Sequence, residues 1–476
     1  MISFRAGRLL LGLCPAIVNV LVAEEATRPN FIFLLADDLG YGDLSVQGSQ
    51  SICTPNLDRL AAGGVRFTQF YANAPICSPS RASFVTGQYP QRWKITSAIT
   101  FREENKKWGV ADYLPATAPS LARLLHGAGY TTGHFGKWHL GGGRNVGEAP
   151  LVAHYGFDEV LTQFEGLGDR ILPVFSRPMR PRWGKESRHP LGVESAQLGH
   201  GSVEFVPRAE MTGRWIDRAI AFIKNAKTSG TPFYVNVWPD DPHTPLDPAP
   251  DSRGDGSRAS AYRGVVEGLD RDVGKLIDFV QADPELRANT VIIFASDNGP
   301  EQDVGSSGGY RGAKTTLYEG GIRVPLIVWA PRFIPKEAAG SLDTSSLVMG
   351  MDFVPTILAI AEVAPKSATF DGKNMRDAWF GKPLLSKRTV FWSRPPDQPG
   401  KNGEMPDVAV RAGDWKLLQH DRNKTVELFD LASDPTESTN LADKEPVVVQ
   451  ALQAALQSWR ADVGQTSLSN DPLAIQ

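Results

Sequence analysis

Four short runs that are dominated by apolar residues stand out along the chain. They span residues 30–36, 233–238, 291–296 and 324–329. A short, continuous apolar run is typical of a strand that is buried on both faces of a sheet. We therefore expect these runs to form strands at the centre of one sheet.

Helical periodicity lies between these runs. Apolar residues recur at spacings of three and four over residues 262–280, and more weakly over residues 211–222. Such spacing places the apolar side chains on one face of a helix. Strands that alternate with helices predict an α/β fold with a doubly wound, mostly parallel sheet.

Polar side chains follow two of the runs directly. Asp37 and Asp38 come after the first run, and Asp297 and Asn298 come after the third. The carboxyl ends of parallel strands form the edge at which open α/β sheets bind ligands, so we expect these four residues to converge. Their oxygen ligands suit Ca²⁺ or Mg²⁺ and argue against zinc. One Asp-Asp pair is more often a solvated turn, so the prediction depends on both pairs.

The pattern changes in the last quarter of the chain. Short runs such as 390–392 and 415–418 dominate there, and a final helix is expected over residues 446–463. We interpret residues 366–476 as a smaller C-terminal α+β domain with an antiparallel sheet. Residues 24–365 would then form the larger domain, which carries the candidate site.

Residues 1–23 have the pattern of a secretory signal peptide. Two arginines precede a mostly apolar stretch over residues 9–22, and Ala23 is a candidate cleavage point. This stretch is short for a membrane span and contains Pro15, although a retained anchor is the alternative. No later segment is apolar enough to cross a bilayer. We therefore predict a periplasmic or secreted protein that has no membrane contact after cleavage.

The composition narrows the function further. Lys and Arg number 50 against 53 Asp and Glu, and this balance gives no support to a nucleic-acid partner. Apolar residues make up 41%, which excludes a disordered chain. After signal removal only Cys53 and Cys77 remain, which is no disulfide framework. One bridge between them is formally possible; otherwise we expect Cys53 to pack as a small apolar residue.

The segment that begins Cys77-Ser78-Pro79-Ser80-Arg81 carries most of the candidate chemistry. Proline is tolerated in the first turn of a helix, so Pro79 predicts a helix that begins just after Cys77. Cys77 would then face a helix N-terminus, where free N–H groups favour negative charge. Arg81, four residues later, lies on the same face.

This segment resembles the Cys-x-Pro-Ser-Arg signature of the type I sulfatases, with Gln88 where the family usually has arginine. The resemblance covers nearly the whole mature chain and is nearest to arylsulfatase A and N-acetylgalactosamine-6-sulfatase. Further matching segments are residues 37–43, 136–141, 297–299, 314–321 and 427–442. The resemblance implies an alkaline-phosphatase-like α/β fold with the smaller C-terminal domain described above.

The resemblance also implies that a formylglycine-forming enzyme oxidises Cys77 to formylglycine. One hydroxyl of the hydrated aldehyde attacks sulfur, and the other allows the sulfated intermediate to collapse and expel sulfate. It further implies Ca²⁺, with Mg²⁺ less favoured. The implied metal ligands are Asp37, Asp38, Asp297, Asn298 and the modified Cys77.

The remaining roles follow from the same resemblance. Lys137 would bind a sulfate oxygen, and His139 would remove the proton that allows collapse. Arg81, from its place on the helix face beside position 77, can hold the diol and screen the developing charge. His243 and Lys314 correspond to residues that contact sulfate and protonate the leaving alcohol. Imidazole suits such proton transfer near neutral pH. We treat the other six histidines as structural.

The predicted reaction is hydrolysis of a sulfate ester, with a sulfated carbohydrate or an aryl sulfate as substrate. A phosphonate or phosphate diester hydrolase that uses the same modified residue is one alternative, and a non-catalytic sulfoglycan-binding relative is another. The basic, proline-rich stretch 177–188 is a candidate contact for a polymeric substrate, against the alternative of a solvated loop. Trp93 and Trp183 would stack on a sugar ring or simply pack.

Overall fold

The computed structural model describes residue 1 and residues 28–178, 188, 192–365, 368–385, 387–397 and 405–464. The predicted signal peptide and most of the basic stretch 177–188, including Trp183, lie outside the described residues.

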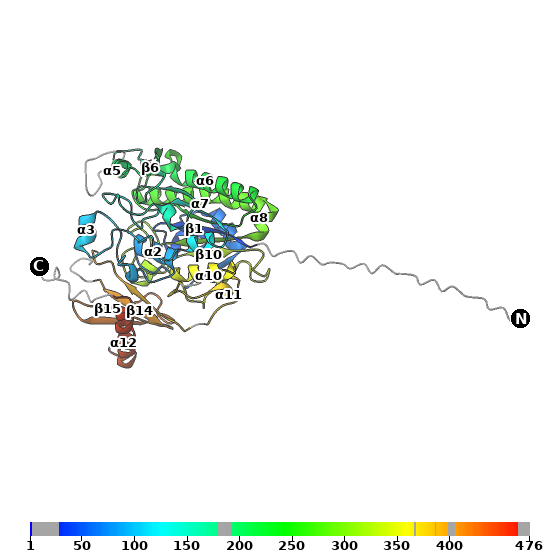
Figure 1. The fold of residues 1–476 in the computed structure, drawn as a ribbon. Coiled ribbons are helices and arrows are strands. Elements are labelled where there is room, and N and C mark those ends of the chain that lie inside the picture. The colour runs from blue at the N-terminus through cyan, green and yellow to red at the C-terminus, as the bar shows by residue number, and fades with distance from the viewer. Residues whose placement is uncertain are drawn as a thin grey trace.

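A ten-stranded sheet forms the centre of the molecule (Figure 1). Its strand order is β11-β2-β10-β9-β1-β8-β4-β5-β6-β7. The bounds are β1 Asn30–Ala36, β2 Val65–Phe67, β4 Thr131–Gly136, β5 Glu159–Thr162, β6 Arg170–Val174, β7 Val203–Pro207, β8 Phe233–Trp238, β9 Thr290–Ser296, β10 Leu326–Trp329 and β11 Ser341–Asp343. Among these strands, β10 is antiparallel to both of its neighbours, and every other pairing is parallel.

The four predicted central strands are therefore confirmed as β1, β8, β9 and β10. β1 and β8 have the predicted bounds, whereas β9 begins one residue earlier, at Thr290. β10 begins at Leu326 rather than at Val324. Pro325 precedes it and has no N–H to donate to the sheet, so the ladder starts after the proline.

The alternation along β1 shows why the sheet is covered on both faces. Phe31, Phe33 and Leu35 belong to one apolar core, and Ile32 and Leu34 belong to another. The first core contains residues of α2 (Cys77–Thr86), α4 (Leu121–His126), α10 (Phe353–Ile360) and α11 (Arg376–Trp379). The second contains residues of α1 (Pro55–Ala62), α6 (Met211–Thr228), α7 (Arg258–Ala282) and α8 (Pro284–Asn289). The doubly wound sheet is thus confirmed, and Figure 1 shows α6–α8 and α10–α11 on opposite sides of it.

A separate four-stranded antiparallel sheet lies in the C-terminal part. Its strands, in order, are β13 Thr389–Ser393, β14 Val408–Ala412, β15 Trp415–His420 and β16 Thr425–Asp430. Helix α12 (Pro446–Asp462) packs on this sheet through Leu452, Leu456 and Trp459. The predicted antiparallel sheet and final helix are confirmed, while the boundary after residue 365 stays a prediction.

Short elements complete the fold. They are β3 Phe70–Tyr71, β12 Val348–Met349, α3 Arg102–Lys107, α5 Gly192–Gln197 and α9 Glu319–Ile322. Across the described part of the chain, no helix has both the length and the apolar character that a membrane span requires.

Both cysteines of the described residues are free. Cys77 is buried, and Cys53 is exposed, so the formally possible bridge between them does not form. The expectation that Cys53 packs as an apolar residue is wrong. Its backbone N–H bonds to the Glu267 carboxylate, and its side chain is left facing solvent.

Candidate active site

The polar residues that follow β1 and β9 meet at the end of the sheet. The two strands are parallel neighbours, with Ala36 opposite Ser296. The Asp38 backbone N–H donates to Asp297 Oδ1 at 3.2 Å, and Asn298 Nδ2 donates to Asp38 Oδ1 at 2.7 Å. The predicted convergence is therefore observed, and all of these side chains are buried.

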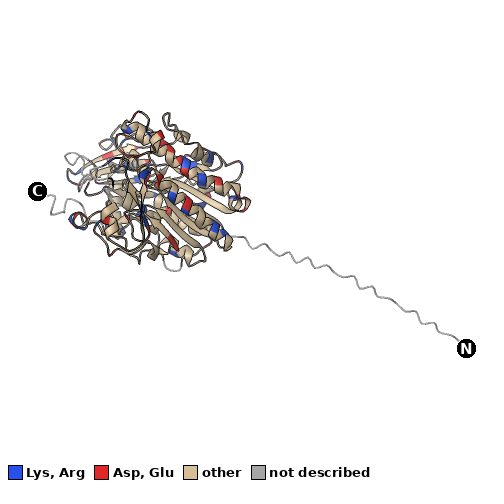
Figure 2. Ribbon diagram, turned by 90° about the horizontal axis from the view of Figure 1, so that it is seen from above, with Lys and Arg blue, Asp and Glu red and all other residues tan. Residues whose placement is uncertain are grey.

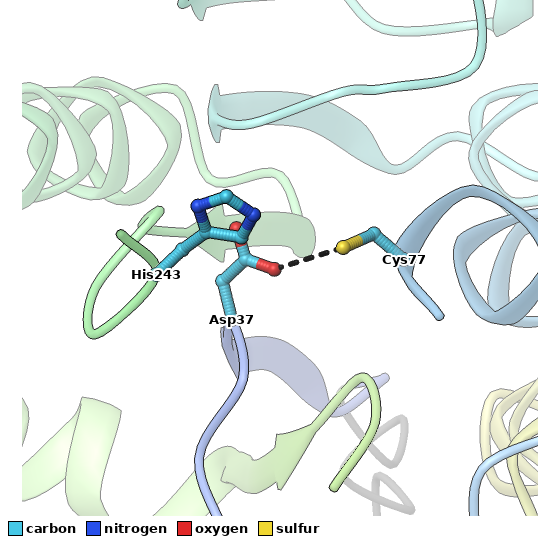
Figure 3. A group of neighbouring side chains, drawn as sticks. All are labelled: Asp37, Cys77 and His243. Carbon is cyan, nitrogen blue, oxygen red and sulfur yellow. Dashed lines mark hydrogen bonds between the residues drawn. The ribbon is translucent and has the colours of Figure 1, made fainter. Parts of the chain in front are cut away.

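Helix α2 brings Cys77 to the same place. The helix begins at Cys77, one residue earlier than predicted. Cys77 Sγ lies 3.3 Å from Asp37 Oδ1, and Figure 3 shows Asp37 between Cys77 and His243. Burial and the charge of Asp37 raise the pKa of the Cys77 thiol. The unmodified side chain is therefore a poor nucleophile, because the thiolate is the reactive form.

Three basic side chains face the three carboxylates. Arg81 Nη2 lies 2.8 Å from Asp297 Oδ2 and 3.5 Å from Asp37 Oδ1. Lys137 Nζ donates to Asp37 Oδ2 at 2.6 Å, and the Lys314 ammonium donates to Asp38. Although burial alone would raise it, Lys137, His243 and Arg81 hold the pKa of Asp37 well below its usual range. The three carboxylates are buried, and each of them is paired with a basic side chain.

The donor set fits a hard divalent cation. One oxygen of each aspartate and the Cys77 sulfur lie within 4.8 Å of one another. The Asn298 amide oxygen is buried and has no hydrogen-bond partner. Burial, together with the charge of Asp37, raises the pKa of Asp297 to about 7, although Arg81 opposes this shift. Carboxylate and amide oxygens are ligands that Ca²⁺ and Mg²⁺ accept.

His139 is held by Glu165, a residue that the sequence analysis missed. His139 Nε2 lies 3.0 Å from the Ile99 carbonyl oxygen, and Nδ1 lies 3.2 Å from Glu165 Oε2. Burial lowers the pKa of His139 to about 3, although the charge of Glu165 opposes this shift. The neutral ring can donate its single proton from Nε2 to the Ile99 carbonyl oxygen. The structure thus places His139 against Ile99 and Glu165 rather than in contact with Cys77. No spacing pattern marks Glu165, which follows β5 in a turn.

His243 approaches from the loop that follows β8. Its Nε2 lies 3.6 Å from Asp38 Oδ2, and 32% of its side chain is exposed. Burial of the ring and the charge of Lys314 lower the pKa of His243. His243 is thus more exposed than Lys137, His139 and Lys314.

A cavity of about 700 Å³ opens above Cys77. Lys137, His139, His243 and Lys314 line it together with Cys77, whereas Arg81 lies behind them. Trp93 is not among the lining residues. Its indole N–H donates to Gln88 Oε1 at 3.1 Å, and its ring packs against the core, which favours the packing interpretation.

Basic side chains gather around Cys77 in the cavity, whereas the molecule as a whole has no excess of positive charge. The chain has a formal net charge of −3, and basic and acidic residues are mixed over the fold (Figure 2). Attraction of an anionic substrate must therefore come from the local arrangement around Cys77.

Family comparisons agree with this geometry. The model of the Sulfatase family matches residues 29–363, and the model described as N-sulphoglucosamine sulphohydrolase, C-terminal, matches residues 309–462. Arylsulfatase A of Bos taurus is 32% identical, over 91% of this chain and 87% of its own. N-acetylgalactosamine-6-O-sulfatase of Bacteroides thetaiotaomicron is 29% identical, over 91% of this chain and 94% of its own.

Solved structures share the fold. The crystal structure of Ps i-CgsB in complex with a neocarrahexaose has a TM-score of 0.72 at 25% identity, over 91% of this chain and 93% of its own. A sulfatase of glycosaminoglycan metabolism from Bacteroides thetaiotaomicron has a TM-score of 0.74 at 25% identity, over 92% of this chain and 100% of its own. The resemblance and the alkaline-phosphatase-like fold that the motifs predicted are confirmed.

Proposed function

The chain belongs to the sulfatase family and is a sulfuric ester hydrolase, and we propose that it acts through a formylglycine formed from Cys77, assisted by Ca²⁺. The observation that carries this proposal is the position of Cys77. It starts α2, lies 3.3 Å from Asp37, and forms the floor of a cavity lined by Lys137 and Lys314.

The surroundings of Cys77 favour a modified residue over a free thiol. As its hydrate, formylglycine supplies an oxygen nucleophile and a second hydroxyl that allows sulfate to leave. Cys77 is only 2% exposed, which supports modification by a formylglycine-forming enzyme before the chain folds. Arg81, fixed by Asp297, is one helical turn away and would hold the hydrate in place.

The basic residues of the cavity would bind the sulfate group. Lys137 and Lys314 carry their charge next to Cys77 and can each donate to a sulfate oxygen. Donors that are already fixed in a water-poor site stabilise charge that develops in the transition state. His243, at the exposed side, would give a proton to the leaving alcohol. His139, which Ile99 and Glu165 hold in place, would serve proton transfer at position 77.

The ion would be held by Asp37, Asp38, Asp297, Asn298 and the modified residue 77. It would polarise a sulfate oxygen and lower the pKa of the nucleophile. Three carboxylates face Arg81, Lys137 and Lys314, so a divalent cation leaves a net positive charge for the sulfate. We favour Ca²⁺ over Mg²⁺, because Mg²⁺ usually retains several waters and Ca²⁺ accepts all-protein cages.

The substrate class is a sulfated carbohydrate or an aryl sulfate. The cavity combines aromatic and polar side chains, as binding sites for small molecules do. One similar protein is named N-acetylgalactosamine-6-O-sulfatase, and one similar structure holds a neocarrahexaose.

We also propose that the protein is exported to the periplasm or the medium, on the pattern of residues 1–23. Fractionation of cells and N-terminal sequencing of the exported protein test this proposal.

The test of function is release of sulfate from a panel of sulfated glycans, 4-nitrophenyl sulfate and a matched phosphate diester. The protein is made with a formylglycine-forming enzyme, and mass spectrometry measures conversion of Cys77. We expect sulfate release by the converted protein and none by Cys77→Ala. Faster turnover of the diester would indicate a phosphodiesterase. Glycan binding by the fully converted protein without turnover would indicate a binding protein.

A further inference from the structure

Among the described residues, three basic side chains that line the cavity have no role in the proposed chemistry, and one of them is neither exposed at the rim nor held by two carboxylates. The Lys and Arg residues that line the cavity are Lys107, Lys137, Arg144, Arg208 and Lys314. Lys137 and Lys314 belong to the cluster beside Cys77. Arg208 is paired with two carboxylates, at 3.3 Å from Asp240 and 2.7 Å from Asp241. Lys107 is exposed at the rim. Arg144 remains.

The charge of Arg144 is only partly compensated. Its Nη2 lies 3.2 Å from Glu165 Oε1. The same carboxylate faces Lys137 at 3.6 Å and His139 at 3.2 Å. Although burial alone would raise it, these basic groups lower the pKa of Glu165 to about 2. Arg144 therefore shares its carboxylate partner with Lys137 and His139, so its own positive charge is only partly offset.

Aromatic rings fix the orientation of Arg144. The guanidinium carbon lies 5.4 Å from the centre of the Phe101 ring and 5.9 Å from that of Phe164. Nε is buried without a hydrogen-bond partner, and 21% of the side chain is exposed. A guanidinium held between rings keeps its planar donor edge ready for a ligand and loses little freedom on binding.

The backbone that leads to Arg144 has an unusual conformation, with positive φ values at several residues. Gly141 and Gly142 have φ values of +111° and +86°, and Arg144 itself has φ +56°. A Cβ on Gly141 would lie 2.2 Å from Tyr113 Cβ. A left-handed conformation is uncommon for arginine and persists where the surrounding structure imposes it. The loop therefore holds Arg144 at the cavity wall.

We propose that Arg144 binds a second anionic group of the substrate, a carboxylate or a sulfate, beside the ester that is cleaved. The substrates would then be polyanionic sulfated carbohydrates rather than singly charged esters. This inference rests on the proposed function and specifies its substrate class. The fork of a guanidinium donates two parallel hydrogen bonds to either anion, which a lysine ammonium cannot do.

The test compares substrates that differ in their second charge. They are 4-nitrophenyl sulfate, a disulfated monosaccharide and a monosulfated disaccharide that contains a uronic acid. For Arg144→Gln we expect kcat/KM on at least one polyanion, relative to that on 4-nitrophenyl sulfate, to fall about 10- to 100-fold. Arg144→Lys should give an intermediate loss. A loss confined to the uronate assigns a carboxylate, and one confined to the disulfated sugar assigns a sulfate.

Two results would overturn the inference. If Arg144→Gln reduces turnover of all three substrates equally, Arg144 acts only through Glu165. If turnover of all three substrates is unchanged, the residue binds no second anion. Arg59→Gln, on the exposed side of α1, is the matched control.

Binding measurements separate this inference from the proposed function. The Cys77→Ala protein and the Cys77→Ala/Arg144→Gln protein are compared by calorimetry with the same polyanions. We expect a dissociation constant about 10- to 100-fold higher for the double variant. Equal constants would reject the anion site even in an active enzyme. Conversely, failure of the wild type to release sulfate would reject the proposed function whatever the binding shows.

Discussion

The side-chain amide of Asn298 donates to Asp38 Oδ1 at 2.7 Å, although 260 positions separate the two residues. The same nitrogen also donates to the Gly299 carbonyl at 3.0 Å. Both amide hydrogens are thereby used, and the amide oxygen is left buried without a partner. A buried acceptor with no donor is unfavourable unless a cation or water serves it. The contact with Asp38 therefore orients the amide oxygen that we propose as a ligand of the cation.

Replacing Asn298 by leucine should weaken calcium binding. Leucine has a similar size but removes both the oxygen and the donor to Asp38. After chelation and readdition, we expect the Ca²⁺ concentration for half-maximal sulfate release to rise about 10- to 100-fold. The Ca²⁺-dependent increase in melting temperature should shrink in parallel. Asn225→Leu, on the exposed face of α6, is the control. An unchanged calcium requirement in Asn298→Leu would contradict the assignment.

The sequence predicted the residues that directly follow the apolar strands and missed those that lie in the loops farther along. Asp37 and Asp297 could be placed together, because buried parallel strands bring their carboxyl ends to one edge. Glu165 and Arg144 occupy loops whose course depends on packing against distant residues such as Tyr113. No periodicity describes such loops. The contacts of His139 could not be predicted for the same reason, since they involve Ile99 and Glu165.

Changing His243 to glutamine should affect poor leaving groups most. A sugar alcohol needs a proton as it leaves, whereas 4-nitrophenolate leaves without one. We therefore expect kcat/KM to fall about 100- to 1,000-fold on a sulfated sugar and less than about 10-fold on 4-nitrophenyl sulfate. His126→Gln, at an exposed position away from the cavity, should change neither. Equal losses on both substrates would show that His243 only binds sulfate.

The C-terminal sheet is joined to the segment that carries Lys314 by a buried ion cluster. Lys416, on β15, is fully buried, with Nζ 2.9 Å from Glu319 Oε1 and 2.8 Å from Glu437 Oε1. Glu319 lies five residues after Lys314, and its backbone N–H donates to Glu437 at 2.6 Å. The cluster therefore fixes one side of the active site from a different sheet.

Lys416→Met should destabilise the fold strongly. It removes the cation that pairs with Glu437 and leaves Glu319 with Arg323 as its basic partner, and uncovering a buried carboxylate in this way costs about 3–5 kcal/mol. The free energy of unfolding in urea measures the loss. Lys275→Met breaks a pair with Asp272 in which the lysine is 52% exposed, and it should cost less than about 1 kcal/mol. Similar losses in the two variants would show that the buried cluster contributes no more than a surface pair.

Glu437 should make the stability depend on pH. Burial, together with the like charge of Glu319 and against the opposing charge of Lys416, raises the pKa of Glu437 from 4.5 to about 7. The folded state thus holds the proton more tightly, so this contribution to stability is complete below pH 4.5 and is lost as the pH rises through 7.

The Glu437→Gln variant tests this dependence, because a glutamine side chain has no proton to lose in this pH range. Between pH 5 and 8, we expect the free energy of unfolding of the wild type to fall about 2 to 3 kcal/mol relative to that of Glu437→Gln. Glu362→Gln, at an exposed position, should follow the wild type. Parallel profiles for the wild type and Glu437→Gln would reject the raised pKa.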